Sequence, residues 1–389
     1  MHVIYLFPHF TGSSGAGNVV LSTAKLLVER GVEVTIIAQE GREDIIRGYD
    51  NVRFEFVGGP LPKSLVHWLE YPFIYRRVRK IIDKLAPDII FPHVFPANYW
   101  GLIYKLERPQ SKLVWYCHEP SAFIHDNAVI AGLPAHLRAL ATLVNPPMRC
   151  LDVHMSRRCD DILVNSRFTA ERAHLIYGIE PKVAYPGVDL NGYPCNQAAK
   201  EQFFFSAGRL TRFKNMDMLI RAVALLRDKG KKAELRIAGD GPEKGSLALL
   251  AKELGVDDQV WLMGELSRDD LVDNYARSLA VLFPSIGEPL GLIPLEAQAS
   301  HTAVIAFNSG GSRETVVPGE TGILLDRFSP EGLAEAMYKA LDDIGGLVEM
   351  GQRGRERIES CFTWSNTIDK LMEAFNGKLN VQTASEKQR

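Results

Sequence analysis

The chain has 389 residues, of which 46% are hydrophobic and 24% are charged, and its formal net charge is −2 at pH 7. This length predicts two domains of ordinary size, and the near-neutral balance argues against nucleic acid as a partner. No apolar run reaches the roughly 18 residues of a membrane span, and the N-terminus lacks the basic segment of a secretory signal. Five cysteines are scattered without a C-x2-C pair, which is typical of reduced thiols in a cytoplasmic protein.

The first half of the chain alternates strands with helices. Residues 2–7 (HVIYLF) and 33–37 (EVTII) have the apolar pattern of buried strands, with a helical pattern at 19–30 between them. Further strands are predicted at 52–57, 88–91, 112–116, 161–165 and 182–185. Continuous apolar strands separated by helices predict a parallel sheet covered on both faces. On such a sheet, ligands bind beyond the carboxyl ends of the strands.

The loop between the first strand and the first helix, TGSSGAGNVV, is rich in small residues and continues directly into the helix. Glycine allows the backbone to approach a ligand closely. The loop lacks the G-x-G-x-x-G spacing of a dinucleotide-binding loop, so a dinucleotide cofactor is not expected. A plain tight turn is the alternative interpretation.

Residues 74–85 (IYRRVRKIIDKL) have the pattern of an amphipathic helix. Val78 and Ile82 fall on one face, whereas Arg76, Lys80 and Lys84 fall on another. This pattern predicts a helix that covers the first sheet and has a solvated basic side. The alternative is that the basic side docks on anionic lipid headgroups, which would place the protein peripherally on the inner face of the membrane.

The strand at 112–116 leads into His118, which therefore lies at a carboxyl end of the sheet. A histidine there can hydrogen-bond a sugar hydroxyl or the charge that develops in a transition state. Glu119 could fix the tautomer of this histidine, and a purely structural histidine is the alternative. Residues 121–147 have no clear period and include a break at Pro146-Pro147, and we expect them to form acceptor-side structure.

A Pro-Gly turn at 186–187 and the polar segment after it are typical of a hinge. We therefore place a first domain at 1–192, a second at 193–362 and a C-terminal segment at 363–389. The second domain repeats the alternation of the first. A strand and a turn are predicted at 203–210, further strands at 234–239, 259–264 and 279–283, and helices at 215–229, at 243–254 and up to about residue 277.

Two basic residues, Arg209 and Lys214, lie just beyond the first strand of the second domain. They can converge on one anion, because arginine forks onto phosphate oxygens and lysine supplies a point charge. Two solvated surface charges are the alternative. Farther on, the strand that ends at Met263 and Gly264 is expected to line the base of a nucleotide through its backbone groups.

Residues 283–296, FPSIGEPLGLIPLE, pass from a buried strand through a loop into a helix. Proline suits the first turn of a helix, and glycine lets a ligand approach the backbone. The free amides of Gly291, Leu292 and Ile293 can therefore receive an anion at the positive end of this helix.

The same segment carries Glu288 and Glu296, which are eight positions apart. At about 1.5 Å per residue, this spacing corresponds to roughly 12 Å along a helix. A nucleotide-sugar has polar groups at both ends and phosphates between them, and it matches that span. Two unrelated surface acids on one helix are the alternative.

With these motifs together, the chain resembles the retaining glycosyltransferases of family 4. Glu288 and Glu296 form the E-x7-E motif of that family, and PLGLIPLEA and GRL-x3-KN follow its wording. The segment at 308–314, NSGGSRE, resembles its G-G-x-x-E loop. The resemblance implies the α/β fold called GT-B, in which two Rossmann-like domains face a central cleft and a last helix crosses back to the first domain.

The resemblance also implies roles for individual residues. In the family, the first glutamate contacts hydroxyls of the donor sugar and the second holds the ribose. The basic pair Arg209 and Lys214 becomes the clamp for the diphosphate, and His118 becomes a contact to the donor sugar.

The small-residue loop is similar to the GGAERVVL-type loop of the family, with Gly15 and Ala16 at glycine positions. There the backbone approaches the donor diphosphate and sugar. Gly17 stands where family members commonly have an acidic residue, so any role of that acid is absent. Glu314 begins a helix, where an acid is favourable in any case.

The resemblance implies a retaining glycosyltransferase. We expect it to need no metal, because the sequence has no D-x-D motif, and we expect no resident cofactor. The segment YCH-x-P is closest to mannosyltransferases that build lipid-linked oligosaccharides, so GDP-mannose is the expected donor and a UDP-linked glucose or N-acetylglucosamine the alternative. The expected acceptor is a glycan or a lipid-linked glycan. A nucleotide-sugar 2-epimerase and a non-catalytic nucleotide-sugar-binding protein are the rival classes.

Overall fold

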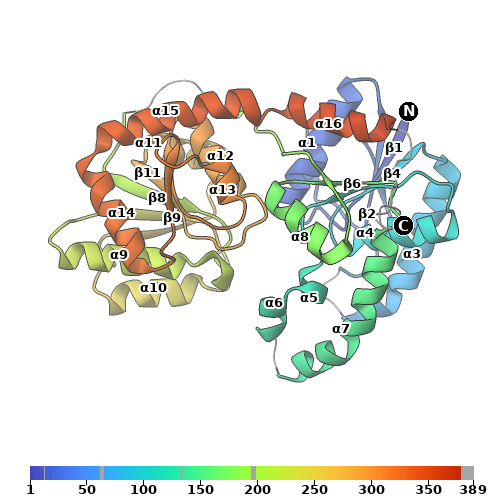
Figure 1. Ribbon diagram of the computed structural model, residues 1–389, viewed down its shortest axis with the longest axis horizontal. Coiled ribbons are helices and arrows are strands. Elements are labelled where there is room, and N and C mark those ends of the chain that lie inside the picture. The colour runs from blue at the N-terminus through green and yellow to red at the C-terminus, as the bar shows by residue number, and fades with distance from the viewer. Residues whose placement is uncertain (13, 62–64, 133–134, 194–198, 378–389) are drawn as a thin grey trace, which may run out of the picture. The chain divides into compact units, whose positions relative to one another are not determined.

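The computed structural model describes residues 1–12, 14–61, 65–132, 135–193 and 199–377, and the chain divides into two compact units (Figure 1). Unit 1 comprises Met1–Pro186 and Ser365–Arg389, and unit 2 comprises Gly187–Trp364. This division falls before the expected boundary at residue 192. The reason is that the Val188 amide donates a 2.9 Å hydrogen bond to the Phe362 carbonyl, which ties the start of unit 2 to its end.

Unit 1 is built on parallel strands that follow the predicted ones closely. Four strands are ordered β3-β2-β1-β4 and three are ordered β5-β6-β7, and a single bridge between Ile90 and Leu113 joins the two groups. The strands are β1 His2–Leu6, β2 Glu33–Ala38, β3 Arg53–Phe56, β4 Ile89–Pro92, β5 Val114–Cys117, β6 Asp161–Val164 and β7 Lys182–Val183. The predicted parallel sheet of the first half is therefore confirmed.

The helices of unit 1 alternate with these strands or follow them in the chain. They are α1 Gly15–Glu29, α2 Glu43–Ile46, α3 Leu65–Leu85, α4 Ala97–Glu107, α5 Ala122–His125, α6 Asn127–Ala131, α7 Ala135–Ser156, α8 Arg167–Tyr177 and α16 Trp364–Asn376. In α3, Val78 and Ile82 are fully buried, whereas Arg76 and Lys80 are exposed. The predicted amphipathic helix is thus confirmed, with its apolar face in the core.

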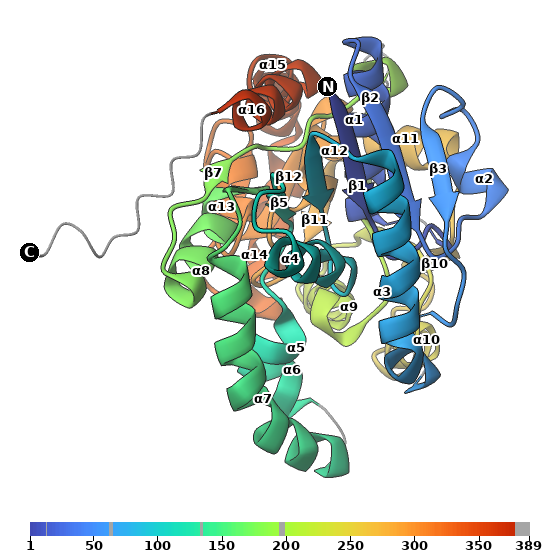
Figure 2. The same cartoon turned by 90° about the vertical axis from the view of Figure 1, so that its right-hand side faces the viewer.

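The region between β5 and β6 differs from expectation. The sequence predicts a break at Pro146-Pro147, but both prolines lie inside the 22-residue helix α7. Proline removes one backbone hydrogen bond and disfavours a helix interior. Here both prolines are exposed, so water can solvate the carbonyls that lose their donors. Helices α5, α6 and α7 extend away from the sheet of unit 1 (Figure 2).

The C-terminal helix α16 packs on unit 1. Its Asp369 pairs with Arg30, the C-terminal cap of α1, and the Phe375 ring lies edge-on to Phe91 of β4 at 5.0 Å. The Lys112 ammonium donates a 2.6 Å hydrogen bond to the Phe375 carbonyl. These contacts place residues 365–377 with the first unit, although they follow the second unit in sequence.

Unit 2 contains one parallel sheet of six strands in the order β10-β9-β8-β11-β12-β13. The strands are β8 Phe203–Ala207, β9 Glu234–Ala238, β10 Val260–Gly264, β11 Ala280–Phe283, β12 Ala303–Phe307 and β13 Gly322–Leu325. The helices are η1 Leu190–Gly192, η2 Arg212–Lys214, α9 Met216–Asp228, α10 Lys244–Glu253, α11 Arg268–Arg277, α12 Leu292–Ala299, α13 Ser312–Thr315, α14 Pro330–Asp342 and α15 Ile344–Cys361. The chain reverses direction across the sheet between β8 and β11, the kind of position where doubly wound sheets bind ligands.

Candidate active site

The loop between β11 and α12 has the features of an anion site. Gly291 is the N-terminal cap of α12 and has φ 85°, a conformation that glycine adopts without strain. The cap has no side chain that could accept a hydrogen bond, so the first-turn amides of Leu292 and Ile293 are available to a ligand. The structure thus places the three predicted amides together at a helix N-terminus.

Two predicted residues from distant parts of unit 2 meet at this loop. The Lys214 ammonium lies 2.5 Å from a carboxylate oxygen of Glu288, and both side chains are partly exposed. The loop that carries Lys214 is fixed by Asn215, whose side-chain amide donates a 3.0 Å hydrogen bond to the Pro284 carbonyl. The structure therefore brings Lys214, which is expected to bind phosphate, into contact with Glu288, which is expected to bind the sugar.

The glycine pair at 310–311 packs against the backbone of the loop that carries Glu288. The Gly311 amide donates a 2.8 Å hydrogen bond to the Glu288 carbonyl. A Cβ atom on Gly311 would lie 2.3 Å from Cα of Leu290, so only glycine fits there. These two glycines thus allow the backbone segments to pack closely, since a Cβ on Gly310 would lie 2.4 Å from the Glu288 carbonyl oxygen.

We expect Gly311→Ala to lower both stability and activity, because the added methyl group must push the Glu288 loop away. Overpacking of this kind costs about 1–3 kcal/mol. Gly245→Ala in α10 is the matched control, since a Cβ there meets nothing within 4 Å. Thermal melting and any transfer assay check this prediction, and a Gly311→Ala protein that behaves like Gly245→Ala would contradict it.

Arg209 follows β8 and is exposed. It forms no hydrogen bond or ion pair through its side chain with any residue that the structure describes. The loop beneath it is held by close backbone packing, because a Cβ on Gly239 would lie 2.0 Å from the Gly208 carbonyl oxygen. Among the described residues, Arg209 is thus a cation without a side-chain hydrogen bond or ion pair, and it lies on a loop held by backbone packing.

The second glutamate of the motif, Glu296, is held by two side chains that the sequence did not identify. The Tyr275 hydroxyl donates a 3.0 Å hydrogen bond to one carboxylate oxygen, and Arg268 lies 3.5 Å from the other. Burial raises the pKa of Glu296, and the Arg268 guanidinium opposes that rise. The Arg268 guanidinium also lies 4.6 Å from the centre of the Tyr193 ring. Because each carboxylate oxygen has two lone pairs, Glu296 can still accept hydrogen bonds from a ligand.

The end of β10 carries Met263 and Gly264. Met263 is 38% exposed. The Gly264 carbonyl accepts a 2.7 Å hydrogen bond from the Gly239 amide, so this carbonyl is engaged within the protein. The side chain of Met263 therefore remains the more accessible group for contact with a base.

In unit 1, Gly15 and Ala16 form the first turn of α1, after the loop that follows β1. Ser14 caps the helix and accepts a 3.0 Å hydrogen bond from the Gly17 amide. Gly17, which replaces the acidic residue of the family, is buried, and a Cβ there would lie 2.9 Å from the Ser14 hydroxyl. The glycine at position 17, where the family commonly has an acidic residue, thus leaves room for the Ser14 side chain that caps the helix.

His118 lies beyond β5, as predicted, but its ring partner is another histidine. His118 Nε2 is 3.0 Å from His93 Nδ1, and the Asn165 amide group donates a 3.0 Å hydrogen bond to the His118 carbonyl. Burial lowers the pKa of His118 to about 3, so its ring is neutral near pH 7. The sequence suggested Glu119 as the partner, and the structure shows His93 in that place.

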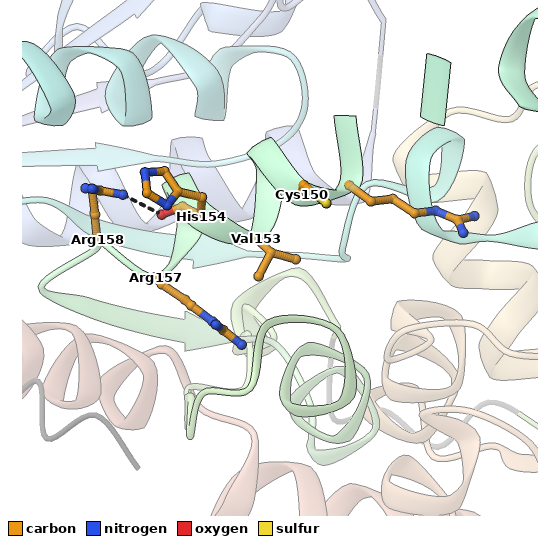
Figure 3. A pocket seen from close by; sticks show the side chains of 6 residues that line it. Cys150, Val153, His154, Arg157 and Arg158 are labelled. Atoms are coloured by element: carbon orange, nitrogen blue, oxygen red, sulfur yellow. Dashed lines mark hydrogen bonds between the residues drawn. The ribbon is translucent and has the colours of Figure 1, made fainter. Parts of the chain in front are cut away.

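A cavity of about 570 Å³ lies along the C-terminal half of α7 (Figure 3), lined by Arg149, Cys150, Val153, His154, Arg157 and Arg158. The side chains of Arg157 and Arg158 point in different directions. Arg157 donates to the Tyr177 carbonyl, and Arg158 donates to the His154 carbonyl. None of the predicted site residues lines this cavity, and its cations do not converge on one point.

Among the described residues, no helix combines the length and apolar character needed to cross a bilayer. The same residues contain no group of three or more His, Cys, Asp or Glu side chains arranged to hold a metal ion.

Each half of the chain matches the model of a known glycosyltransferase family. Residues 13–191 match the family described as Glycosyltransferase Family 4, and residues 195–357 match the family described as Glycosyl transferases group 1. The D-inositol 3-phosphate glycosyltransferase of Corynebacterium glutamicum (strain R) is 30% identical, with 97% of this chain and 95% of that protein aligned. The enzyme of the same name from Corynebacterium efficiens is 28% identical, over 97% and 93% of the two chains.

Solved structures show the same fold at lower identity. Sucrose-phosphate synthase from Thermosynechococcus elongatus has a TM-score of 0.78 at 19% identity, covering 96% of this chain and 98% of that one. The HepE protein of Anabaena in complex with UDP-glucose has a TM-score of 0.77 at 18% identity, again covering 96% and 98%. These likenesses show the GT-B fold with two Rossmann-like domains.

Proposed function

The chain belongs to family 4 of the glycosyltransferases, and from that premise we propose that it transfers a hexose from a nucleotide-diphosphate sugar to an acceptor hydroxyl with retention of the anomeric configuration. The observation that supports this most directly is the pairing of Lys214 with Glu288 beside the N-terminus of α12. A cation, a carboxylate and free amides lie together there, and this combination suits the point where a sugar joins a diphosphate.

In the proposed reaction, the bond between the anomeric carbon and the diphosphate oxygen breaks. The acceptor oxygen bonds to that carbon on the same face, and the acceptor proton passes to the departing diphosphate. Lys214, Arg209 and the α12 amides stabilise the negative charge that develops on the leaving group. Glu288 and His118 hold the sugar.

Glu296 holds the ribose in this proposal. The carboxylate is already oriented by Tyr275 and Arg268, so a hydroxyl ligand meets a fixed acceptor. Gly15, Ala16 and Met263 are proposed as further contacts to the donor, the first two beside the diphosphate and sugar and the last beside the base.

GDP-mannose is the proposed donor, and UDP-linked hexoses are the alternative. The YCH-x-P segment supports the first, whereas a fold relative crystallised with UDP-glucose supports testing the second. We expect GDP to raise the melting temperature, because a ligand at 100 times its Kd adds about 2.7 kcal/mol of stability. Stabilisation by UDP but not by GDP would contradict the mannose proposal.

Transfer itself is tested by incubating the protein with radiolabelled donors and a panel of acceptors. The relatives named above are D-inositol 3-phosphate glycosyltransferases, so an inositol phosphate belongs in that panel alongside glycans and lipid-linked glycans. Epimerised donor in the absence of acceptor, or nucleotide binding without transfer to any acceptor, would contradict the proposed activity.

We also propose that α3 docks on anionic lipid. Leu69 and Phe73 are 77% and 62% exposed, and they lie on the same helical face as Arg76 and Lys80. An apolar end followed by a basic stripe suits the boundary between acyl chains and headgroups.

For α3, we expect salt-sensitive co-sedimentation with phosphatidylglycerol vesicles and loss of binding in the Arg76→Glu, Lys80→Glu double variant. Each basic residue near the surface contributes about 1 kcal/mol to binding. The double variant Lys229→Glu, Lys252→Glu makes the same change in net charge on exposed residues of unit 2 and serves as the control. Equal binding by both double variants would leave α3 as a structural helix only.

A further inference from the structure

The position of His93 is fixed by its surroundings. Its amide donates a 3.1 Å hydrogen bond to the Leu6 carbonyl, and its carbonyl accepts one of 2.9 Å from the Trp115 indole. The ring is 1% exposed and stacks on the rings of Tyr5 and Tyr116, with centroids at 5.1 and 5.6 Å. The Nδ1 atom is therefore held at the end of β4, where it meets His118.

Only one proton can lie between the two rings. His93 Nδ1 and His118 Nε2 are 3.0 Å apart, and burial lowers the pKa of both histidines below the physiological range, so each neutral ring carries a single N–H. Either His93 donates from Nδ1, or His118 donates from Nε2. In the first arrangement, His118 Nδ1 carries the proton and can donate a hydrogen bond to a ligand. In the second, His118 Nδ1 has a free lone pair and can only accept one.

The other nitrogen of His93 decides between these arrangements. His93 Nε2 is buried and has no hydrogen-bond partner among the described residues. The hydroxyls of the flanking tyrosines donate elsewhere, that of Tyr5 to Thr23 at 3.2 Å and that of Tyr116 to the Ala184 carbonyl at 2.6 Å. If His118 donated, the proton of His93 would sit on Nε2 as a buried N–H without an acceptor. Unpaired buried N–H groups are rarer than buried acceptors with a free lone pair.

We propose that His93 is a positioning residue, which donates from Nδ1 to His118 Nε2 and so keeps the proton of His118 on Nδ1. His118 then acts toward its ligand as a hydrogen-bond donor and cannot accept a proton there. This inference rests on the proposed function, in which His118 contacts the donor sugar. A donor at that place suits a hydroxyl oxygen of the donor sugar, whose lone pairs accept a hydrogen bond.

The tautomer can be read directly by nitrogen NMR of protein labelled at its histidine rings, with the His118 signals assigned by their loss in His118→Asn. We expect wild-type His118 to show a protonated Nδ1 and an unprotonated Nε2 at pH 7. A wild-type His118 that is protonated on Nε2 would overturn the proposal. This measurement needs no substrate, so it decides the tautomer even if the proposed transfer activity fails.

Two substitutions test the consequence for catalysis. His93→Phe keeps an aromatic ring between the tyrosines but removes the donor, and His93→Asn keeps an N–H near the position of Nδ1. We expect kcat to fall about ten- to a hundredfold in His93→Phe, with the Kd for the nucleoside diphosphate changed less than about twofold, and to recover to within about threefold of wild type in His93→Asn. His118 should gain the Nε2 proton in His93→Phe alone.

The comparison is made between variants whose melting temperatures match, so that loss of folding is not read as loss of catalysis. A His93→Phe protein with wild-type kcat would overturn the positioning role. Equal losses in His93→Phe and His93→Asn would do so as well, because they would show that packing and not the donated proton matters. Normal transfer by His118→Ala would instead remove the sugar contact from the proposed function and leave the tautomer result standing.

Discussion

Replacing Glu288 with alanine is expected to abolish sugar transfer while binding of the nucleoside diphosphate persists. The carboxylate is proposed to bind sugar hydroxyls, and each charged hydrogen bond contributes about 1.5–3 kcal/mol. Losing two such bonds lowers kcat/KM by about 10²–10⁴-fold, which most assays record as loss of activity. Glu288→Gln, which keeps the size of the side chain, is expected to lose most of the activity as well.

The ion pair in the structure sharpens this expectation. Lys214 lies 2.5 Å from Glu288, so removing the carboxylate frees the ammonium for the diphosphate. Titration calorimetry with the nucleoside diphosphate should therefore show unchanged or tighter binding in Glu288→Ala. Glu296→Ala should weaken the nucleotide itself, since its carboxylate is proposed to hold the ribose. Equal loss of nucleotide affinity in the two variants would show that the ends of the donor site are reversed.

The sequence predicted the sheets well because their signals are local. Strands such as β1 and β11 are continuous apolar runs bounded by turn residues, and each of them is fully or almost fully buried. The loops that carry the E-x7-E segment and the basic pair follow such strands directly. Topology then places them at one edge of a parallel sheet, which explains why Lys214 and Glu288 meet across 74 positions of sequence.

The contacts that the sequence missed depend on packing between elements. His93 meets His118 because β4 and β5 are neighbours, and neither segment carries a motif that names the other. Tyr275 and Arg268 lie on α11, and only the fold brings them to Glu296. Polar partners of this kind leave no periodic pattern, so their positions follow from the folded structure alone.

The helix α7 escaped prediction for a different reason. An amphipathic helix is recognised by its buried stripe, but Leu140 and Leu143 of α7 are 56% and 77% exposed. The Pro146-Pro147 pair is also a strong local signal against a helix. The proline pair therefore led to a prediction of irregular structure where the fold has a long helix.

Lys214→Ala and Arg209→Ala are expected to lower kcat by about 10²–10³-fold while the affinity for the donor falls much less. Both cations are proposed to stabilise charge that develops on the diphosphate only as the sugar leaves, and interactions made only in the transition state appear in kcat. The effect should be larger for Lys214, because its removal leaves the Glu288 carboxylate without its cation beside the anionic donor. Arg212→Ala is the matched control, since Arg212 is an exposed cation in the same turn η2 and makes no ion pair with the described residues.

The pairing of Lys214 with Glu288 can be separated from the action of either residue on the donor by a double-mutant cycle. A coupling energy between Lys214→Ala and Glu288→Ala in nucleotide affinity would show that the two side chains act on each other, whereas additive effects would show that each acts on the donor independently. The proposed cationic clamp also predicts that EDTA leaves the wild-type rate unchanged. A protein inactivated by EDTA and restored by magnesium or manganese would show that a metal ion, and not Lys214 with Arg209, neutralises the leaving diphosphate.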